Sequence, residues 1–464
     1  MVSANGNTGI TQTLAKFYAN LDYESLSPET IDRAKYFCLD YLGMALRGSI
    51  MDSSIVMQRA INRISPNGDS ITMGTSLRAS PEYAALANGC AAHSIEMDDV
   101  ANIASLHPAV PTFPTAFACA DITRVTGRQF ISSITSGYDI MVRLGRTLNP
   151  QKHYARGFHP TSTCGTFGAA VVSSNLLGLD AQKTLWALGI AGSQAAGSQE
   201  YLSEGAWTKR FHPGWASHSG IVASLLAREG FVGPLSILEG KYGFFHAYTD
   251  GADPSIAIED LGEIFYINRT SIKPYACCRY KQGPIDCLLK VMQENRLDPK
   301  DISRVTIAIL KAGYNTVASP VEKKRNPQNV VEAQFSMHFG AAVAILYGKV
   351  SLDEYTDEVI GRQEIKDMMQ KVDCVEDPAL ELNYPAQWPA WVEIQTNNGL
   401  SFKADITYPK GDPENALTWD ELKEKFKGLV QPIISPSRAN EIIGMVDSLE
   451  DLENVRELAE LTSV

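Results

Sequence analysis

The sequence predicts a mainly α protein that combines a large, discontinuous, all-helical domain with a smaller α+β lid domain. Apolar residues recur at helical spacing up to about residue 265, and no convincing alternating segment occurs before that point. β-Branched and alternating segments appear later, and helical spacing returns near the end of the chain. We therefore expect residues 1–266 and 406–464 to form the helical domain and residues 267–405 to form the lid. A chain of 464 residues is long enough for two cores.

Capping residues and periodic apolar side chains predict the helices of the first domain. Ser27-Pro28-Glu29 supplies an N-cap residue, a proline at the first helical position and an acidic first turn. Residues 207–215 (WTKRFHPGW) instead predict a shaped loop, because a proline, a glycine and two tryptophans lie close together. Further helices are expected over residues 81–93, 128–146, 163–177, 181–197 and 215–230.

Strand and turn signals define the second domain. Residues 304–310 (RVTIAIL) are β-branched and bounded by turn signals. Residues 391–405 alternate around Asn398-Gly399, which is typical of a two-residue hairpin turn. Thr418-x-x-Glu421 then predicts a capping box, and we expect the closing helices to rejoin the first domain. Other helices are expected over residues 331–346, 361–371 and 439–461.

Composition disfavours several classes of protein. The formal net charge of −12 argues against non-specific nucleic-acid binding, which requires a basic face. The longest apolar run, near residues 339–346, is too short to span a membrane, and residues 1–21 lack the basic and apolar regions of a signal peptide. The eight cysteines show neither a C-x-x-C pair nor zinc spacing. These features predict a cytoplasmic protein with reduced thiols, no metal site, and no nucleic-acid or membrane partner.

Residues 91–108 concentrate titratable side chains between two apolar segments. Charged side chains in such a position must be paired, solvated in a cleft, or functional. The sequence leaves open a second interpretation, in which a helix ends in a solvated loop and the two aspartates serve as capping residues. The side chains concerned are His93, Glu96, Asp98, Asp99 and His107.

Residues 157–165 (GFHPTSTCG) form a second candidate stretch. A histidine before a proline, followed by three hydroxyl groups, can position an imidazole and donate hydrogen bonds to a carboxylate. Thr161 or Ser162 can equally be the N-cap residue of the next helix, which would leave His159 with a structural role.

Two basic stretches complete the set of candidates. In residues 207–215, aromatic neighbours can desolvate Lys209 and lower its pKa, and a cation in such a pocket also holds a carboxylate. The alternative is a solvated lysine beside an aromatic cluster. The tandem Cys277-Cys278 in the second stretch is interpreted as structural. That stretch, residues 273–286, carries the cations Lys273, Arg279 and Lys281.

Several catalytic motifs are absent. The sequence has no G-x-G-x-x-G after a strand, no Walker A loop, no H-E-x-x-H and no G-x-S-x-G. The remaining histidines, lysine and carboxylates suit proton transfer next to a carboxylate or carbonyl of a small anionic substrate, without a cofactor.

Taken in order along the chain, these stretches resemble the MmgE/PrpD family. That family includes 2-methylcitrate dehydratase, cis-aconitate decarboxylase and iminodisuccinate epimerase. The resemblance implies a homodimer that needs no metal, with each active site between a helical domain and a lid. The matching motifs are Asn88-Gly89, His93, Glu96, Asp98-Asp99, His107-Pro108, Gly157–Thr161, Lys209 with His212-x-Gly214, Tyr242-Gly243, Lys273-Pro274-Tyr275-x-Cys277 and Glu332–Ser336.

The resemblance also implies roles for individual residues. It assigns catalysis to His107, His159 and Lys209. The resemblance also places Tyr314 at the site. Our working hypothesis gives substrate binding to Tyr314 together with Glu96, Asp98, Arg210, His212, Lys273, Arg279 and Gln282.

At three positions the chain departs from the decarboxylase-type pattern. Glu96 replaces an aspartate, Val100 replaces a polar residue, and Gln282 replaces a histidine. Glutamine cannot exchange a proton, so the lid lacks a proton carrier there unless Lys281 substitutes. We predict a cofactor-independent, dehydratase-like lyase. The alternatives are an epimerase of an iminodisuccinate-type dicarboxylate, a cis-aconitate-type decarboxylase, and a repurposed, non-catalytic family member.

Overall fold

The computed structural model describes residues 9–464 and shows a mainly α chain with one small mixed sheet. This confirms the predicted fold class. Residues 1–8, which contribute to the signal-peptide prediction, lie outside the described residues. The first compact unit contains residues 9–94, 98–270 and 418–464, and the second contains residues 95–97 and 271–417.

Helices dominate the first unit. A short antiparallel ladder, β1 (Ser70–Ile71) with β2 (Arg78–Ala79), was not predicted. The helices are α1 (Ile10–Tyr18), α2 (Pro28–Ser49), α3 (Asp52–Ile64), α4 (Pro81–His93), α5 (Ala109–Ile122), α6 (Gly127–Thr147), α7 (Pro150–Ala155), α8 (Pro160–Leu176), α9 (Ala181–Gly192), α10 (Tyr201–Glu204), α11 (Thr208–Arg228), α12 (Phe244–Ala247), α20 (Trp419–Val430), α21 (Pro436–Asp447) and α22 (Arg456–Glu460).

Two of the predicted capping signals are confirmed. The Ser27 side chain accepts a hydrogen bond from the backbone N–H of Thr30 at the start of α2. Thr418 and Glu421 form a reciprocal capping box at the start of α20. Each side chain satisfies backbone N–H groups that the first helical turn leaves without a partner.

The start of two helices differs from the prediction. Helix α8 begins at Pro160, so His159 and not Thr161 or Ser162 occupies the N-cap position. Helix α11 begins at Thr208, so the loop predicted for residues 207–215 is wrong. The glycine that suggested this loop has another purpose. A Cβ atom at Gly214 would lie 2.2 Å from the carbonyl oxygen of Leu86, so glycine is required where α11 crosses α4.

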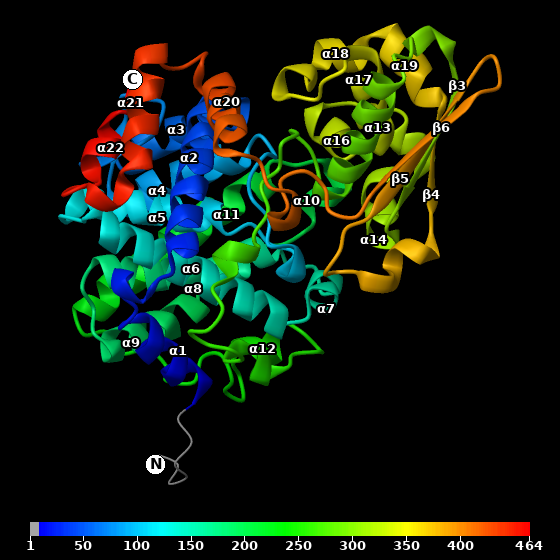
Figure 1. Ribbon diagram of the computed structural model, residues 1–464. Helices are drawn as coiled ribbons and strands as arrows, with labels where there is room; N and C mark the ends of the chain where they lie inside the picture. The colour runs from blue at the N-terminus through cyan, green and yellow to red at the C-terminus, as the bar shows by residue number, and fades with distance from the viewer. Residues whose placement is uncertain (1–8) are drawn as a thin grey trace. The chain divides into compact units, whose positions relative to one another are not determined.

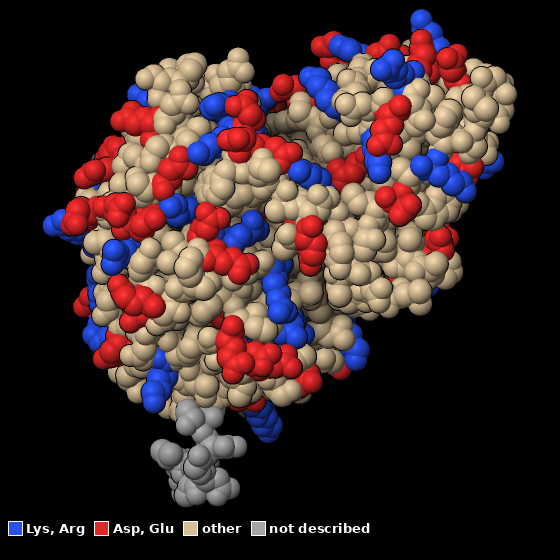
Figure 2. Space-filling model, in the orientation of Figure 1, with Lys and Arg blue, Asp and Glu red and all other residues tan. Residues whose placement is uncertain are grey.

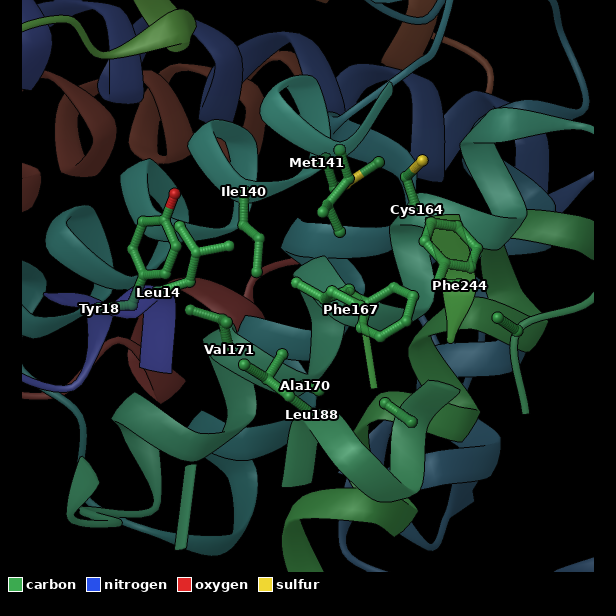
Figure 3. Packing of buried hydrophobic residues seen from close by; sticks show 14 of the residues in the cluster. Leu14, Tyr18, Ile140, Met141, Cys164, Phe167, Ala170, Val171, Leu188 and Phe244 are labelled. Carbon is green, nitrogen blue, oxygen red and sulfur yellow. The ribbon is translucent and has the colours of Figure 1, made fainter. Parts of the chain in front are cut away.

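A close-packed core joins helices of the first unit that are far apart in sequence. Figure 3 shows side chains from α1, α6, α8 and α9 interdigitating around Phe167, with Phe244 beside it. The C-terminal helices α20 and α21 pack against α2 near the other end of the chain (Figure 1). Burial of this apolar surface is the main stabilising contribution to such a fold.

The second unit is a four-stranded sheet with helices. Its strand order is β4-β3-β5-β6, with β4 parallel to β3 and the other pairs antiparallel. Helix α13 packs against β5 and β6, and α17 packs against β4. The strands are β3 (Ile302–Ile309), β4 (Val372–Glu376), β5 (Ala390–Thr396) and β6 (Ser401–Ile406). The helices are α13 (Gln282–Glu294), α14 (Lys311–Gly313), α15 (Val321–Lys324), α16 (Val330–Gln334), α17 (Met337–Tyr347), α18 (Asp357–Gly361) and α19 (Gln363–Gln370).

The hairpin between β5 and β6 is confirmed, but its turn is longer than predicted. The backbone N–H of Thr396 donates to the carbonyl of Leu400 at 2.9 Å, which leaves three residues in the loop. Gly399 adopts φ 84°, a left-handed conformation that suits glycine. A three-residue loop with glycine at its left-handed position is a common alternative to the two-residue turn.

Two surface features bear on the predicted partners. The face shown in Figure 2 carries acidic and basic side chains interspersed, so the net negative charge is not gathered into one patch there. Across residues 9–464, no helix combines the length and apolar character needed to cross a bilayer. None of the eight cysteines, all of which lie within residues 9–464, forms a disulfide bond.

Candidate active site

Four of the eight histidines converge inside the first unit. The ring centroids of His93 and His107 are 5.2 Å apart, those of His93 and His159 are 6.0 Å apart, and those of His159 and His212 are 5.2 Å apart. We call these four residues the histidine cluster. They come from the last residue of α4, the segment before α5, the N-cap position of α8 and the second turn of α11.

A close helix crossing brings α4 and α11 together at the cluster. A Cβ atom at Gly89 would lie 2.7 Å from the Cα atom of Gly214, so the two glycines face each other directly. His93 lies one helical turn beyond Gly89, and His212 lies two residues before Gly214. The crossing therefore fixes the relative positions of two of the four imidazoles.

Substituting Gly214 with alanine is expected to destabilise the first unit by about 1–3 kcal/mol, because the added methyl group meets a backbone carbonyl that cannot move freely. Thermal unfolding followed by circular dichroism measures the loss. Gly444→Ala in α21 is the matched control, since no atom lies within 4 Å of the added Cβ. That variant should be neutral or slightly stabilising. Equal behaviour of the two variants would contradict the crossing argument.

Asp98 joins two imidazoles of the cluster. Its Oδ2 atom lies 2.8 Å from Nδ1 of His93 and 3.1 Å from Nδ1 of His107. Asp99 has a different task, because its carboxylate accepts the backbone N–H of Ala109 at 3.0 Å at the start of α5. The predicted solvated loop is wrong, because residues 91–101 are buried. Asp99 does accept a backbone N–H at a helix start, whereas Asp98 belongs to the histidine cluster. Burial raises the pKa of Asp99 well above its ordinary value.

His159 and His212 form a direct imidazole pair. Their Nδ1 atoms are 3.0 Å apart, so one ring donates and the other accepts. Burial, together with the other positive groups around the pair, holds the pKa of His159 well below its ordinary value. Burial, His93 and Lys209 lower the pKa of His212 to about 4. Both rings are therefore neutral at neutral pH and can accept a proton.

Two buried cations lie at the start of α11, and one of them, Lys209, acts on the imidazole pair. Lys209 is 8% exposed, and its charge contributes to the lowered pKa of both His159 and His212. Arg210 is 6% exposed, and its guanidinium donates to the hydroxyl of Ser53 at 3.0 Å. Cations that are mostly withdrawn from water attract a carboxylate strongly.

The remaining predicted site residues belong to the second unit. Glu96 adopts φ 58°, and its carboxylate lies 3.9 Å from Nζ of the buried Lys273. The guanidinium of Arg279 forms a 2.5 Å ion pair with Asp412, which also accepts the hydroxyl of Ser271. Arg279 is therefore committed to a structural ion pair within this unit.

Gln282 acts as a clamp on the backbone around it. Its side-chain amide accepts the N–H of Tyr275 at 3.2 Å and donates to the carbonyls of Tyr275 and Cys277 at 3.1 Å. The neighbouring Lys281 is fully buried and donates to the hydroxyl of Tyr355 and to two backbone carbonyls. Burial lowers the pKa of Lys281 to about 8. Tyr314 begins a π-helical turn, Tyr314–Ala318.

Sequence analysis missed Tyr201 and Ser53. The ring of Tyr201 meets those of His159 and His212 edge-on, with centroids 5.9 and 5.7 Å away. No spacing signal connects Tyr201 to the cluster or Ser53 to Arg210, because each contact forms only in the tertiary fold. Within residues 9–464, no group of three or more His, Cys, Asp or Glu side chains is arranged to hold a metal ion.

The fold and the histidine cluster define a class: a mainly α protein in which a neutral imidazole pair lies close to a buried lysine. Family models identify it further. The MmgE/PrpD N-terminal domain matches residues 12–257, and the MmgE/PrpD C-terminal domain matches residues 275–451. The chain therefore belongs to the MmgE/PrpD family.

Relatives with assigned activities align over most of the chain. The cis-aconitate decarboxylase-like protein oryM of Aspergillus oryzae is 28% identical over 98% of this chain and 97% of its own length. The cis-aconitate decarboxylase of Homo sapiens is 27% identical over 97% of this chain and 94% of its own length. The 2-methylcitrate dehydratase of Salmonella typhimurium is 22% identical over 88% of this chain and 87% of its own length. Decarboxylases and dehydratases of this kind are lyases, and this chain is an enzyme of lyase type.

Proposed function

We propose that the chain is a cofactor-independent lyase that moves a proton at a carbon next to a carboxylate of a small polycarboxylate. The observation that supports this proposal is the histidine cluster, in which the neutral imidazole pair of His159 and His212 lies close to the charge of Lys209. Imidazole groups can accept and return protons, and a buried cation holds a carboxylate group.

Decarboxylation of a cis-aconitate-type acid is our first candidate, because the relatives named as decarboxylases share more identity over more of the chain. In that reaction the bond between the carbon and one carboxylate breaks and carbon dioxide leaves. The electron pair remains on the carbon chain as a carbanion, which Lys209 would stabilise. An imidazole that has taken up a proton from water then delivers that proton to the carbon and returns to its neutral form.

Dehydration is the second candidate, favoured by the similarity to the 2-methylcitrate dehydratase. There an imidazole removes a proton from the carbon next to a carboxylate. The hydroxyl group on the neighbouring carbon leaves as water after a second group has protonated it. Both reactions pass through carbanionic character next to a carboxylate, and the same cations would support each.

Proton NMR of the purified full chain in D₂O distinguishes these reactions. The panel contains cis-aconitate, citrate, 2-methylcitrate and iminodisuccinate. Loss of carbon dioxide from cis-aconitate is the expected result. A new vinyl signal from a hydroxy acid would indicate dehydration, and deuterium entering without net product would indicate an epimerase. No change with any compound would contradict the proposal and favour a repurposed family member.

Substituting His159 with glutamine is expected to lower turnover by at least about a hundredfold, because glutamine cannot exchange a proton. Steady-state kinetics on the substrate found above measures the change. His153→Gln is the matched control, since His153 is also fully buried but forms hydrogen bonds with the carbonyl of Tyr248 and the hydroxyl of Thr163, outside the cluster. A loss of tenfold or less in folded His159→Gln would remove His159 from proton transfer.

A further inference from the structure

His93 is the most deeply buried residue of the histidine cluster. The reaction steps described above give it no role of its own. We propose that His93 is a positioning residue. By holding Asp98, it helps to keep the proton of His107 on Nδ1, which leaves Nε2 of His107 as the nitrogen that exchanges protons with the substrate. The part played by His107 in turnover rests on the proposed lyase function, whereas its tautomer does not.

The surroundings of His107 fix its tautomer. Its Nδ1 atom lies 2.5 Å from the backbone carbonyl oxygen of Asp99. A carbonyl oxygen can only accept, so Nδ1 must carry the proton. Oδ2 of Asp98, 3.1 Å from the same nitrogen, is a second acceptor. In the neutral ring Nε2 is then left with its lone pair.

His93 donates to the same carboxylate oxygen from another direction. Its Nδ1 atom lies 2.8 Å from Oδ2 of Asp98, and an ionised carboxylate only accepts. A single oxygen thus receives hydrogen bonds from two imidazoles. His93 is fixed at the end of α4, so this bond restrains the carboxylate relative to His107.

The other nitrogen of His93 argues against a purely structural imidazole. Within the described part of the chain, Nε2 of His93 is buried and has no hydrogen-bond partner. Leaving a buried polar atom unpaired costs free energy, and an apolar residue would avoid that cost. The hydrogen bond from Nδ1 to Asp98 is what accounts for an imidazole here.

A pair of substitutions separates this role from simple packing. His93→Leu removes the donor, whereas His93→Asn keeps an amide donor close to where Nδ1 lies. We expect His93→Leu to lower turnover by about tenfold to a hundredfold through misplacement of Asp98 and His107. His93→Asn should recover most of that loss. Equal impairment of both variants, or full activity of both, would overturn the proposal.

The tautomers can be observed directly in protein labelled with ¹⁵N-histidine. Two-bond nitrogen–proton correlations show which ring nitrogen carries the proton, and loss of a signal in His107→Gln assigns it. The wild-type protein should show His107 protonated on Nδ1. The Nε2-protonated form should become detectable in His93→Leu and disappear in His93→Asn.

The nitrogen–proton NMR measurement does not depend on turnover, so it tests the positioning role of His93 separately from the proposed lyase function. A wild-type His107 protonated on Nε2 would overturn the positioning role even in an active enzyme. A wild-type protein that is inactive on the whole panel would contradict the lyase proposal and leave the tautomer result standing. If His93→Leu does not fold, Asp98→Asn replaces it, with the same expected loss of turnover and growth of the Nε2-protonated form.

Discussion

Substituting His107 with glutamine is expected to lower turnover by about 10²- to 10⁴-fold, the range that loss of a general acid–base group produces. The backbone carbonyl of Asp99 and the carboxylate of Asp98 together hold the proton of this ring on Nδ1, which leaves the lone pair of Nε2 for proton exchange, and the side chain is 12% exposed. Glutamine can fill the space but cannot carry a proton. Steady-state kinetics on the substrate identified by NMR measures the effect, with circular dichroism to confirm folding.

A matched control excludes a general effect of replacing histidine. His246 lies on the exposed surface of α12, outside the cluster. His246→Gln should keep wild-type turnover. If folded His107→Gln kept more than a tenth of wild-type turnover, His107 would not be the group that exchanges the proton at carbon.

Replacing Asp139 with asparagine should lower the free energy of unfolding by about 3–5 kcal/mol, because it leaves the buried charge of Arg143 without a counterion. Both side chains are fully buried, with Nε of Arg143 2.7 Å from Oδ2 of Asp139. Asp139 also accepts the hydroxyl of Tyr18 at 2.8 Å, which ties α1 to α6. Differential scanning calorimetry measures the shift in the unfolding midpoint.

The exposed ion pair Glu358–Arg362 provides the comparison. It has the same four-residue spacing and the same 2.7 Å separation, but both side chains face water. Glu358→Gln should therefore leave the unfolding midpoint nearly unchanged. A similar effect of both substitutions would show that burial of the Asp139–Arg143 pair does not increase its contribution to the free energy of unfolding.

Local signals explain why much of the fold was predictable. The N-cap at Ser27, the capping box at Thr418 and the helical spacing over residues 81–93 each depend on residues within a few positions of one another. Such signals act through short-range hydrogen bonds and side-chain periodicity, which sequence displays directly.

Long-range contacts explain the errors. Gly214 suggested a loop, but it is needed because α11 crosses α4 there, and no local pattern reveals a partner more than a hundred residues away. Strand β4 was missed because its five residues lack alternation and are stabilised by parallel pairing with β3. Tertiary context overrides local propensity at both places.

The candidate site was also predictable only in part: its residues could be named from the sequence, but their contacts could not. Residue types and order along the chain singled out His107, His159 and Lys209 before any geometry was known. They did not show that Asp98 binds two imidazoles, that Gln282 clamps the backbone of Tyr275, or that Tyr201 meets the imidazole pair. These relations need three-dimensional contacts between separate segments.

The closeness of the four imidazoles also affects how kinetic data on this enzyme can be interpreted. Groups that touch one another lose and gain protons as a set, so each apparent pKa of a pH–rate profile belongs to the whole set. A substitution at His212 would thus shift the acidic limb even if the substrate never meets that ring. For this enzyme, pH profiles report the protonation state of an assembly, and spectroscopy of single nitrogens is needed to assign a proton to one ring.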